Sequence, residues 1–201
     1  MLNIDPRKAF DSVLHPALML KLIELGVGGN FCRVLKYVYS NIELRAKTDK
    51  ILSVRRIFLY YLSVPGSQLS PNLFNLLIDG IIKSFDSSCE PVTLDSKLLN
   101  GLLYADDLLL VSESSGSLQN CLNKVYDYCS NWGLDINYKK TKVMIFGKGS
   151  RLVTHKFFIN NVEIECVRQY KYLGVLFTLN GSSKEALIDL HTRGRTVFFS
   201  N

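Results

Sequence analysis

Two adjacent aspartates, Asp106 and Asp107, interrupt the strongly apolar run "LLYADDLLLVS". Burying an unpaired carboxylate costs so much free energy that the group would normally neutralise or stay in solvent. A divalent cation offsets this cost, because it holds like charges together and prefers carboxylate oxygens as ligands. The pair therefore predicts a magnesium site, with manganese as the alternative metal; the structural alternative is a polar turn in solvent.

A pair of acids on one strand usually needs another carboxylate from a neighbouring strand. Asp5 is the preferred candidate, because it follows the apolar Leu2 and Ile4 and would stand at a strand end. Asp11 competes for this role, but it lies nearer the first helix and could cap it. Acids of this kind can hold two metal ions about 3.5 to 4 Å apart, which activate a 3′-hydroxyl and stabilise a leaving pyrophosphate. The predicted chemistry is that of a polymerase.

The elements that position these acids follow from apolar periodicity. Helices are expected over residues 16–26, 30–39, 70–85 and 115–132. Ser70 is expected to cap the third helix, and Gly133 to end the fourth. The two aspartates stand between "KLLNGLLY" and "LLLVS", which predicts a hairpin with both acids at its tip.

Extended segments alternate with these helices. They are expected at residues 2–4, in two pieces within 42–64, at 142–147, in a hairpin over 156–167 that turns at Asn160 and Asn161, and at 172–177, with a last helix over 182–195. Tyr170 and Tyr172 are expected to pack on a sheet. This order predicts an α+β fold in which an antiparallel sheet is backed by helices.

Composition excludes a disordered chain. Of the 201 residues 47% are hydrophobic, which suffices for one compact domain, or a core with a small appendage. The formal net charge of +6 favours a polyanionic partner, with nucleic acid as the first candidate. The five cysteines form no C-x-x-C pair, so reduced, packed thiols of an intracellular protein are expected. No apolar run is long enough to span a membrane, and a soluble protein is expected.

Five segments, in order, resemble the motifs of reverse transcriptases from non-LTR, LINE-type retrotransposons. "DPRKAFDSV" resembles motif A, "GSQLSPNLFNLLI" motif B, "YADDLLLVS" motif C, "GLDINYKKTKVMIF" motif D and "YKYLGVLF" motif E. One such short match is a moderate signal, whereas five in order identify the family. The resemblance implies an RNA-directed DNA polymerase, a nucleotidyltransferase with an RNA template, a DNA primer and deoxynucleoside triphosphates as partners.

The resemblance also implies roles for individual residues. Asp5 and Asp106 take the positions of the two chief magnesium ligands, and Asp107 is the accompanying acid. Phe10 takes the aromatic position that excludes a ribose 2′-hydroxyl and so favours deoxynucleotides. Gly66 takes the place of the motif B glycine, where the lack of a side chain lets the backbone approach the nucleotide.

Motifs D and E concern the leaving group and the primer. Lys140 takes the position of the lysine that donates a proton to pyrophosphate, and Lys139 is the adjacent alternative. Tyr172, Leu173 and Gly174 belong to the turn that holds the primer end. The implied fold is the polymerase palm over residues 1–180, with residues 181–201 as the start of a truncated thumb or a C-terminal tail, and with the fingers largely missing.

The segment before the motif B helix departs from the family pattern. Family members usually have G-V-x-Q-G there, whereas this chain has "LSVPG", with Leu62 and Pro65 in place of the glycine and the glutamine. Proline lacks both the glutamine amide and a backbone N–H donor. Two hypotheses follow: an active polymerase domain, or a catalytically silent, domesticated or decayed copy that at most binds nucleic acid.

Overall fold

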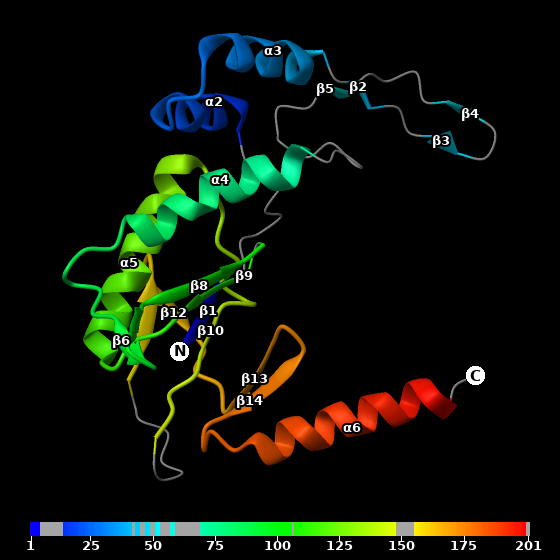
Figure 1. Cartoon of the computed structure of the whole chain (residues 1–201). Helices are drawn as coiled ribbons and strands as arrows, with labels where there is room; N and C mark the ends of the chain where they lie inside the picture. The colour runs from blue at the N-terminus through cyan, green and yellow to red at the C-terminus, as the bar shows by residue number, and fades with distance from the viewer. Residues whose placement is uncertain are drawn as a thin grey trace. The chain divides into compact units, whose positions relative to one another are not determined.

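A computed structural model of the chain describes residues 1–4, 14–41, 43–44, 47–48, 51–52, 57–58, 69–105, 107–147 and 155–199. The described residues form helices and antiparallel sheets, which confirms the predicted α+β class (Figure 1). The helices are α2 (His15–Glu24), α3 (Gly29–Ser40), α4 (Leu69–Lys83), α5 (Ser115–Trp132) and α6 (Ser183–Phe199). The strands are β1 (Leu2–Ile4), β2 (Glu43–Leu44), β3 (Lys47–Thr48), β4 (Ile51–Leu52), β5 (Ile57–Phe58), β6 (Val92–Leu94), β7 (Lys97–Leu99), β8 (Gly101–Tyr104), β9 (Asp107–Leu110), β10 (Lys142–Val143), β11 (Phe157–Ile159), β12 (Val162–Ile164), β13 (Gln169–Tyr172) and β14 (Val175–Thr178).

The chain divides into two compact units. The first comprises Met1–Asp5, Phe85–Lys124 and Asn137–Asn201, and the second comprises Pro6–Ser84 and Val125–Ile136. Helix α5 therefore contributes its first part to one unit and its last part to the other. Among the predicted site residues that the structure describes, Asp107 and the motif D lysines Lys139 and Lys140 belong to the first unit.

The first unit contains a four-stranded sheet with the order β10-β1-β9-β8 (Figure 1). All of its pairs are antiparallel, and Leu2 on the central strand β1 stands opposite Leu110 on β9 and Val143 on β10. The register along β9 ends with Ile4 opposite Leu108. Leu2 and Ile4 are almost completely buried, so this short strand is held by apolar packing as well as by two neighbours.

Three hairpins accompany the sheet in the described part of the first unit: β6–β7, β11–β12 and β13–β14. Their turns contain consecutive residues with positive φ, as tight hairpins of right-handed twist require. Asn160 and Asn161 have φ values of 46° and 63°, which confirms the predicted turn in the β11–β12 hairpin. The predicted hairpin before and after the two aspartates is also confirmed, because β8 pairs with β9.

Three strand predictions were wrong in detail. Residues 172–177 do not form one strand, because Leu173 and Gly174, with φ values of 46° and 82°, turn the chain between β13 and β14. The arm "KLLNGLLY" is divided at Asn100, since β7 pairs with β6 and only β8 pairs with β9. The strand expected at 142–147 is limited to Lys142–Val143, because its partner β1 has only three residues.

The predicted helices are confirmed, and α5 has the predicted bounds. Gly133 follows α5 with a φ of 70°, as the predicted C-terminal stop requires. The predicted cap of α4 was wrong, because the helix already includes Leu69, so that Ser70 lies inside it and is buried. Helix ends commonly differ by one or two residues from a sequence estimate.

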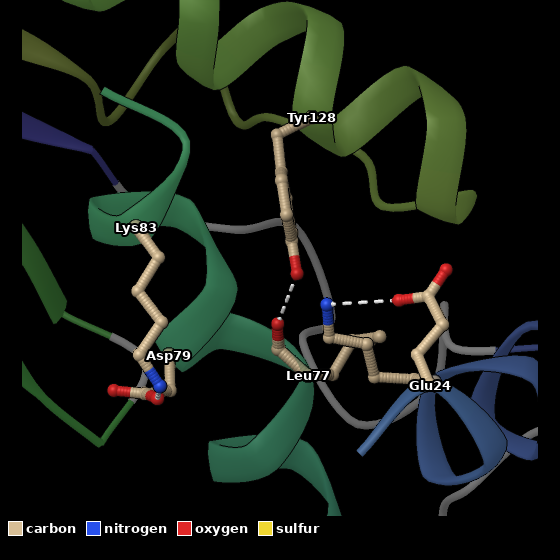
Figure 2. Close-up of polar contacts among 6 residues, drawn as sticks. Glu24, Leu77, Asp79, Lys83 and Tyr128 are labelled. Atoms are coloured by element: carbon tan, nitrogen blue, oxygen red, sulfur yellow. Dashed lines mark hydrogen bonds and ion pairs between the residues drawn. The ribbon is translucent and has the colours of Figure 1, made fainter. Parts of the chain in front are cut away.

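The second unit contains α2, α3, α4 and the last part of α5. Their buried residues recur at helical spacing, for example Leu18 and Leu22 on α2, and Phe74 and Leu77 on α4. Figure 2 shows that Tyr128, from α5, reaches the backbone of α4, where its hydroxyl donates a hydrogen bond of 2.5 Å to the carbonyl of Leu77. This contact satisfies a buried hydroxyl and a helix carbonyl together.

Lys21 and Gly80 also contact Tyr128 at this junction between α5 and α4, within the second unit. The ammonium of Lys21 lies 4.7 Å from the ring centroid of Trp132 and 5.7 Å from that of Tyr128, and it forms an ion pair with Glu24. A Cβ atom at Gly80 would overlap the Tyr128 hydroxyl. Gly80 is therefore required by the close approach of the tyrosine.

The segment predicted to be extended, residues 42–64, contributes paired strands where the structure describes it. β2 pairs with β5, and β3 pairs with β4, both antiparallel. Gly66, Leu62 and Pro65 lie outside the described residues. Four of the five cysteines are buried and none forms a disulfide, in agreement with packed thiols. In the described part of the chain, no helix has the length and apolarity needed to cross a membrane.

Gly80→Ala tests the junction between Tyr128 and α4. Although alanine favours helix, we expect the added methyl group to displace the Tyr128 hydroxyl and to lower the free energy of unfolding by about 2 kcal/mol. Chemical denaturation followed by circular dichroism measures this change. Gly116→Ala in α5 is the matched control: no atom lies within 4 Å of its added Cβ, so it should raise stability by roughly 0.5 kcal/mol. Equal effects of the two changes would contradict the proposed overlap.

Candidate active site at the β8–β9 hairpin

The structure describes part of the predicted site. Asp107 and Lys140 lie within the described residues, whereas Asp5, Phe10, Gly66 and Asp106 lie outside them. The strands that precede and follow the acids are described, however: β1 ends at Ile4, and β9 begins at Asp107. The geometry of the candidate site is therefore given by these strands and by what packs on them.

Asp107 is the first residue of β9 and stands opposite Tyr104, the last residue of β8. Only two residues separate this pair along the chain, and one of them, Ala105, has a φ of 52°. Residues with a Cβ atom seldom adopt this left-handed conformation, and such local strain is concentrated at functional sites. The Asp107 side chain is half-buried. The sequence therefore places a carboxylate at a tight, strained hairpin rather than on an open loop.

Alternation along the strands determines which residues share a face of the sheet. Side chains two residues apart on a strand point to the same side, as do directly opposed residues on neighbouring strands. Asn3 stands opposite Leu109, and Asp107 is two residues from Leu109. Asn3 and Asp107 are therefore on the same face, and Leu2, Ile4, Leu108 and Leu110 are on the other.

The β13–β14 hairpin contacts the Asn3 face. The side-chain amide of Asn3 donates a hydrogen bond of 2.6 Å to the hydroxyl of Tyr170 on β13. Burial, with smaller contributions from the negative charge of Asp107 and from Tyr170, raises the pKa of Tyr172 above its ordinary value. The aromatic hairpin thus lies near the carboxylate of Asp107.

Helix α6 fixes the other side of this hairpin, and the two lie side by side in Figure 1. The guanidinium of Arg193 donates a hydrogen bond of 2.6 Å to the carbonyl of Gly174 in the turn. Asp189 forms ion pairs with Arg193 at 2.6 Å and with Lys171 at 3.3 Å. These contacts join the turn that was predicted to hold a primer end to the last helix.

The motif D lysines lie in the turn that follows residue 136. The backbone N–H of Lys140 donates to the carbonyl of Asn137, and the Thr141 hydroxyl donates to the same carbonyl. The side chains of Lys139 and Lys140 are both exposed, while Lys142 forms an ion pair of 2.6 Å with Glu165. The geometry of the turn does not decide between Lys139 and Lys140 as the motif D lysine.

Among the described residues of the predicted metal site, Asp107 offers carboxylate oxygens, which suit a hard cation such as magnesium. Within the described ranges, no three His, Cys, Asp or Glu side chains gather where they could hold a metal ion. Asp107 is a half-buried carboxylate, the kind of oxygen donor that magnesium prefers. The other two acids of the predicted set, Asp5 and Asp106, lie outside the described residues.

Sequence reasoning missed two residues next to this site. Asn3 was not singled out, and Tyr170 was assigned only a packing role, yet the structure joins them by a hydrogen bond. One signal was present: the polar Asn3 stands between the apolar Leu2 and Ile4. A polar residue in a buried strand requires a hydrogen-bond partner. The partner of Asn3 is 167 residues away along the chain, so the local sequence does not reveal which residue it is.

Comparison with known proteins identifies the class to which this sheet and hairpin belong. Residues 1–177 match the family model described as reverse transcriptase (RNA-dependent DNA polymerase). The chain therefore belongs to the reverse transcriptase family.

Its relatives specify the kind of element. The chain is 30% identical over 188 residues to the Pol polyprotein of the type-2 retrotransposable element R2DM of Drosophila melanogaster, covering 89% of this chain and 18% of that protein. It is 26% identical over 198 residues to an R2 polyprotein of Popillia japonica, covering 94% of this chain and 28% of that one, and 28% identical over 192 residues to one of Nasonia vitripennis, covering 89% and 18%. These similarities confirm the non-LTR, LINE-type resemblance. The chain spans less than a third of the length of each of these three relatives.

Asp107→Asn tests the electrostatic geometry of the site. Because the Asp107 charge helps to raise the pKa of Tyr172, its removal should lower that pKa toward the ordinary tyrosine value. NMR titration of ring-labelled tyrosine, assigned with Tyr172→Phe, measures the change. Asp95→Asn is the control, since Asp95 is not among the causes of the raised Tyr172 pKa. An unchanged Tyr172 titration would show that the carboxylate lies elsewhere.

Proposed function

We propose that this chain carries the palm of a retroelement RNA-directed DNA polymerase, over residues 1–180, and extends a DNA primer on an RNA template. In this reaction the primer 3′-oxygen attacks the α-phosphorus of a deoxynucleoside triphosphate, and pyrophosphate leaves. Family membership supports the reaction class. The assignment of roles to residues in this chain rests on the motifs and on the strands described above.

The pairing of β1 with β9 carries the proposal. Ile4 stands opposite Leu108 in an antiparallel register, and the sequence continues from Ile4 to Asp5 and begins β9 at Asp107. The proposal requires Asp5 to continue this register, which would set it opposite Asp107, next to Asp106. Like-charged carboxylates can be retained at such a point when a divalent cation compensates them.

Asp5, Asp106 and Asp107 would hold the two metal ions, magnesium or manganese. When bound, these ions supply positive charge that activates the attacking hydroxyl and stabilises the leaving pyrophosphate. The half-buried position of Asp107 favours this role, because partial exclusion of water strengthens the attraction between carboxylate and cation.

Other residues would select and orient the substrates. Phe10 would exclude a 2′-hydroxyl, and Gly66 would let the backbone approach the incoming nucleotide. The turn formed by Leu173 and Gly174 would hold the primer end, supported by Arg193 at the Gly174 carbonyl. Lys140 would donate a proton to the departing pyrophosphate.

A catalytically silent copy that binds nucleic acid is the second candidate. The observation that favours it is Pro65, which stands where the family usually has glutamine and removes both an amide and a backbone donor. A net charge of +6 would then support salt-dependent RNA binding without nucleotide incorporation.

A primer-extension assay on a homopolymeric RNA template separates the two candidates. The Asp106→Asn, Asp107→Asn double variant should lower incorporation by about 1,000-fold, because several kcal/mol of metal-dependent stabilisation is lost. Asp95→Asn is the matched control: Asp95 also stands in the turn of a hairpin, with a φ of 47° that asparagine tolerates. Its activity should equal that of the native chain. RNA binding without incorporation above background in any of the three proteins would favour the silent copy.

Metal binding has a readout that does not depend on activity. Addition of magnesium should lower the pKa of Tyr172 in the native chain, because the cation compensates the Asp107 charge that helps to raise it. The same addition should leave the Tyr172 pKa of Asp107→Asn almost unchanged. A magnesium effect of equal size in both proteins would exclude Asp107 as a ligand.

Comparison of Lys139→Ala with Lys140→Ala assigns the motif D lysine. We expect Lys140→Ala to lower kcat by about 100-fold, as loss of a general acid does, and Lys139→Ala to have little effect. The two exposed lysines are matched in charge and in position along the turn, so the reverse result would give the role to Lys139.

A further inference from the structure

Asn3 is buried where an apolar residue would be expected. Only 2% of its surface is exposed, and its neighbours Leu2 and Ile4 are 0% and 1% exposed. Transfer of an amide from water into a protein interior is unfavourable unless its polar atoms find partners. One partner is Tyr170, whose hydroxyl accepts a hydrogen bond of 2.6 Å from the Asn3 amide nitrogen, while the Oδ1 atom is buried without a hydrogen bond. Burial of Asn3 is therefore unfavourable in free energy, and one specific hydrogen bond, to Tyr170, offsets part of this cost.

This contact joins two parts of the candidate site. Asn3 belongs to β1, and the strand register places it on the sheet face that also carries Asp107. Tyr170 belongs to β13, two residues before Tyr172 and three before the turn at Leu173. The hydrogen bond therefore attaches the hairpin to the face that carries the acid.

The hairpin needs such an attachment. A two-stranded hairpin alone is only marginally stable in water, and β13–β14 pairs with no other strand in the described part of the chain. On its outer side, α6 supplies the Arg193 hydrogen bond to Gly174 and the ion pair between Asp189 and Lys171. On the sheet side, the Asn3–Tyr170 bond is a direct polar link between the hairpin and the strand that leads to Asp5.

We infer that Asn3 is a positioning residue, which fixes the β13–β14 hairpin on the sheet face carrying Asp107 through its hydrogen bond to Tyr170. This inference rests on the proposed function for its catalytic consequence: a hairpin that holds a primer end must stand at a constant distance from the metal ligands. An apolar residue at position 3 would favour burial more strongly, but it would not select one position of Tyr170. The polar bond is directional and does so.

Hydrogen exchange of the backbone amides in β13 and β14 tests the attachment without reference to activity. In Tyr170→Phe, these amides should exchange about fivefold to tenfold faster, the factor expected for one lost buried hydrogen bond. Asn3→Val should have the same effect and, combined with Tyr170→Phe, should add little to it. Unchanged hairpin exchange in both single variants would overturn the inference.

Tyr128→Phe is the matched control for a general loss of stability. It removes the hydroxyl of another tyrosine, which donates to the Leu77 carbonyl instead of accepting and which belongs to the second unit. Its hairpin exchange should equal that of the native chain under conditions in which both remain folded. Equal acceleration in Tyr128→Phe and Tyr170→Phe would mean that the Asn3 contact merely contributes to global stability, and would overturn the positioning role.

Primer extension then tests the catalytic consequence. Tyr170→Phe and Asn3→Val should lower kcat by about tenfold, because a small misplacement of the reacting end slows chemistry strongly, while the KM for the nucleotide changes less than about twofold. Tyr128→Phe should leave both constants unchanged. If the native chain extends no primer, the proposed function fails, but the exchange experiment still decides whether Asn3 fixes the hairpin. Normal kcat with accelerated hairpin exchange would contradict the catalytic part of the inference.

Discussion

The pairing of β1 with two neighbouring strands is the constraint on which the rest of the first unit depends. Three residues, Leu2–Ile4, occupy the sheet between β9 and β10, and they bring chain segments more than 100 residues apart into register. A strand this short has little pairing energy of its own. It is held because Leu2 and Ile4 are fully buried on one face and Asn3 is hydrogen-bonded on the other.

Since the side chains of a strand alternate with a period of two residues, a shift of one residue would exchange these faces and would bury the wrong side chains. The register is consequently well determined, and with it the end of β1 at Ile4 and the beginning of β9 at Asp107.

The two faces of this sheet have different tasks. One face carries Leu2, Ile4, Leu108 and Leu110, which are nearly inaccessible to solvent, and it supplies hydrophobic stabilisation. The opposite face combines Asn3 and Asp107 with the tyrosines of the β13–β14 hairpin. Polar groups on a largely buried face lower stability unless they are paired. The proposed polymerase site uses this polar face, and the β13–β14 hairpin provides a partner for one of its polar groups, the Asn3 amide.

Helices and turns could be predicted from local sequence because their signals are local. The apolar stripe of α5 and the glycine that ends it lie within one segment, and its bounds were correct. The Asn160–Asn161 turn likewise carries its conformational preference in two residues. Residues 172–177 were misinterpreted as one strand because an apolar run does not reveal a turn at Leu173, where a side chain with a Cβ atom adopts a positive φ. The family motif indicated that turn, although periodicity did not.

Within the candidate site, too, residues with a local sequence signal could be predicted, whereas residues defined by tertiary contacts could not. The aspartates stand out because charge within an apolar run is costly, and five ordered motifs assign them a role. Asn3 and Tyr170 do not stand out, because each residue alone is compatible with an ordinary strand. Their importance arises only when the fold brings the two side chains within 2.6 Å. Residue types and spacing can thus predict which residues bear the chemistry, whereas the contacts that hold a hairpin on the sheet are defined only by the tertiary structure. A substitution at such a position would leave every motif intact and still alter the distance between the acids and the primer-holding turn, so intact motifs alone are insufficient evidence that a copy is active.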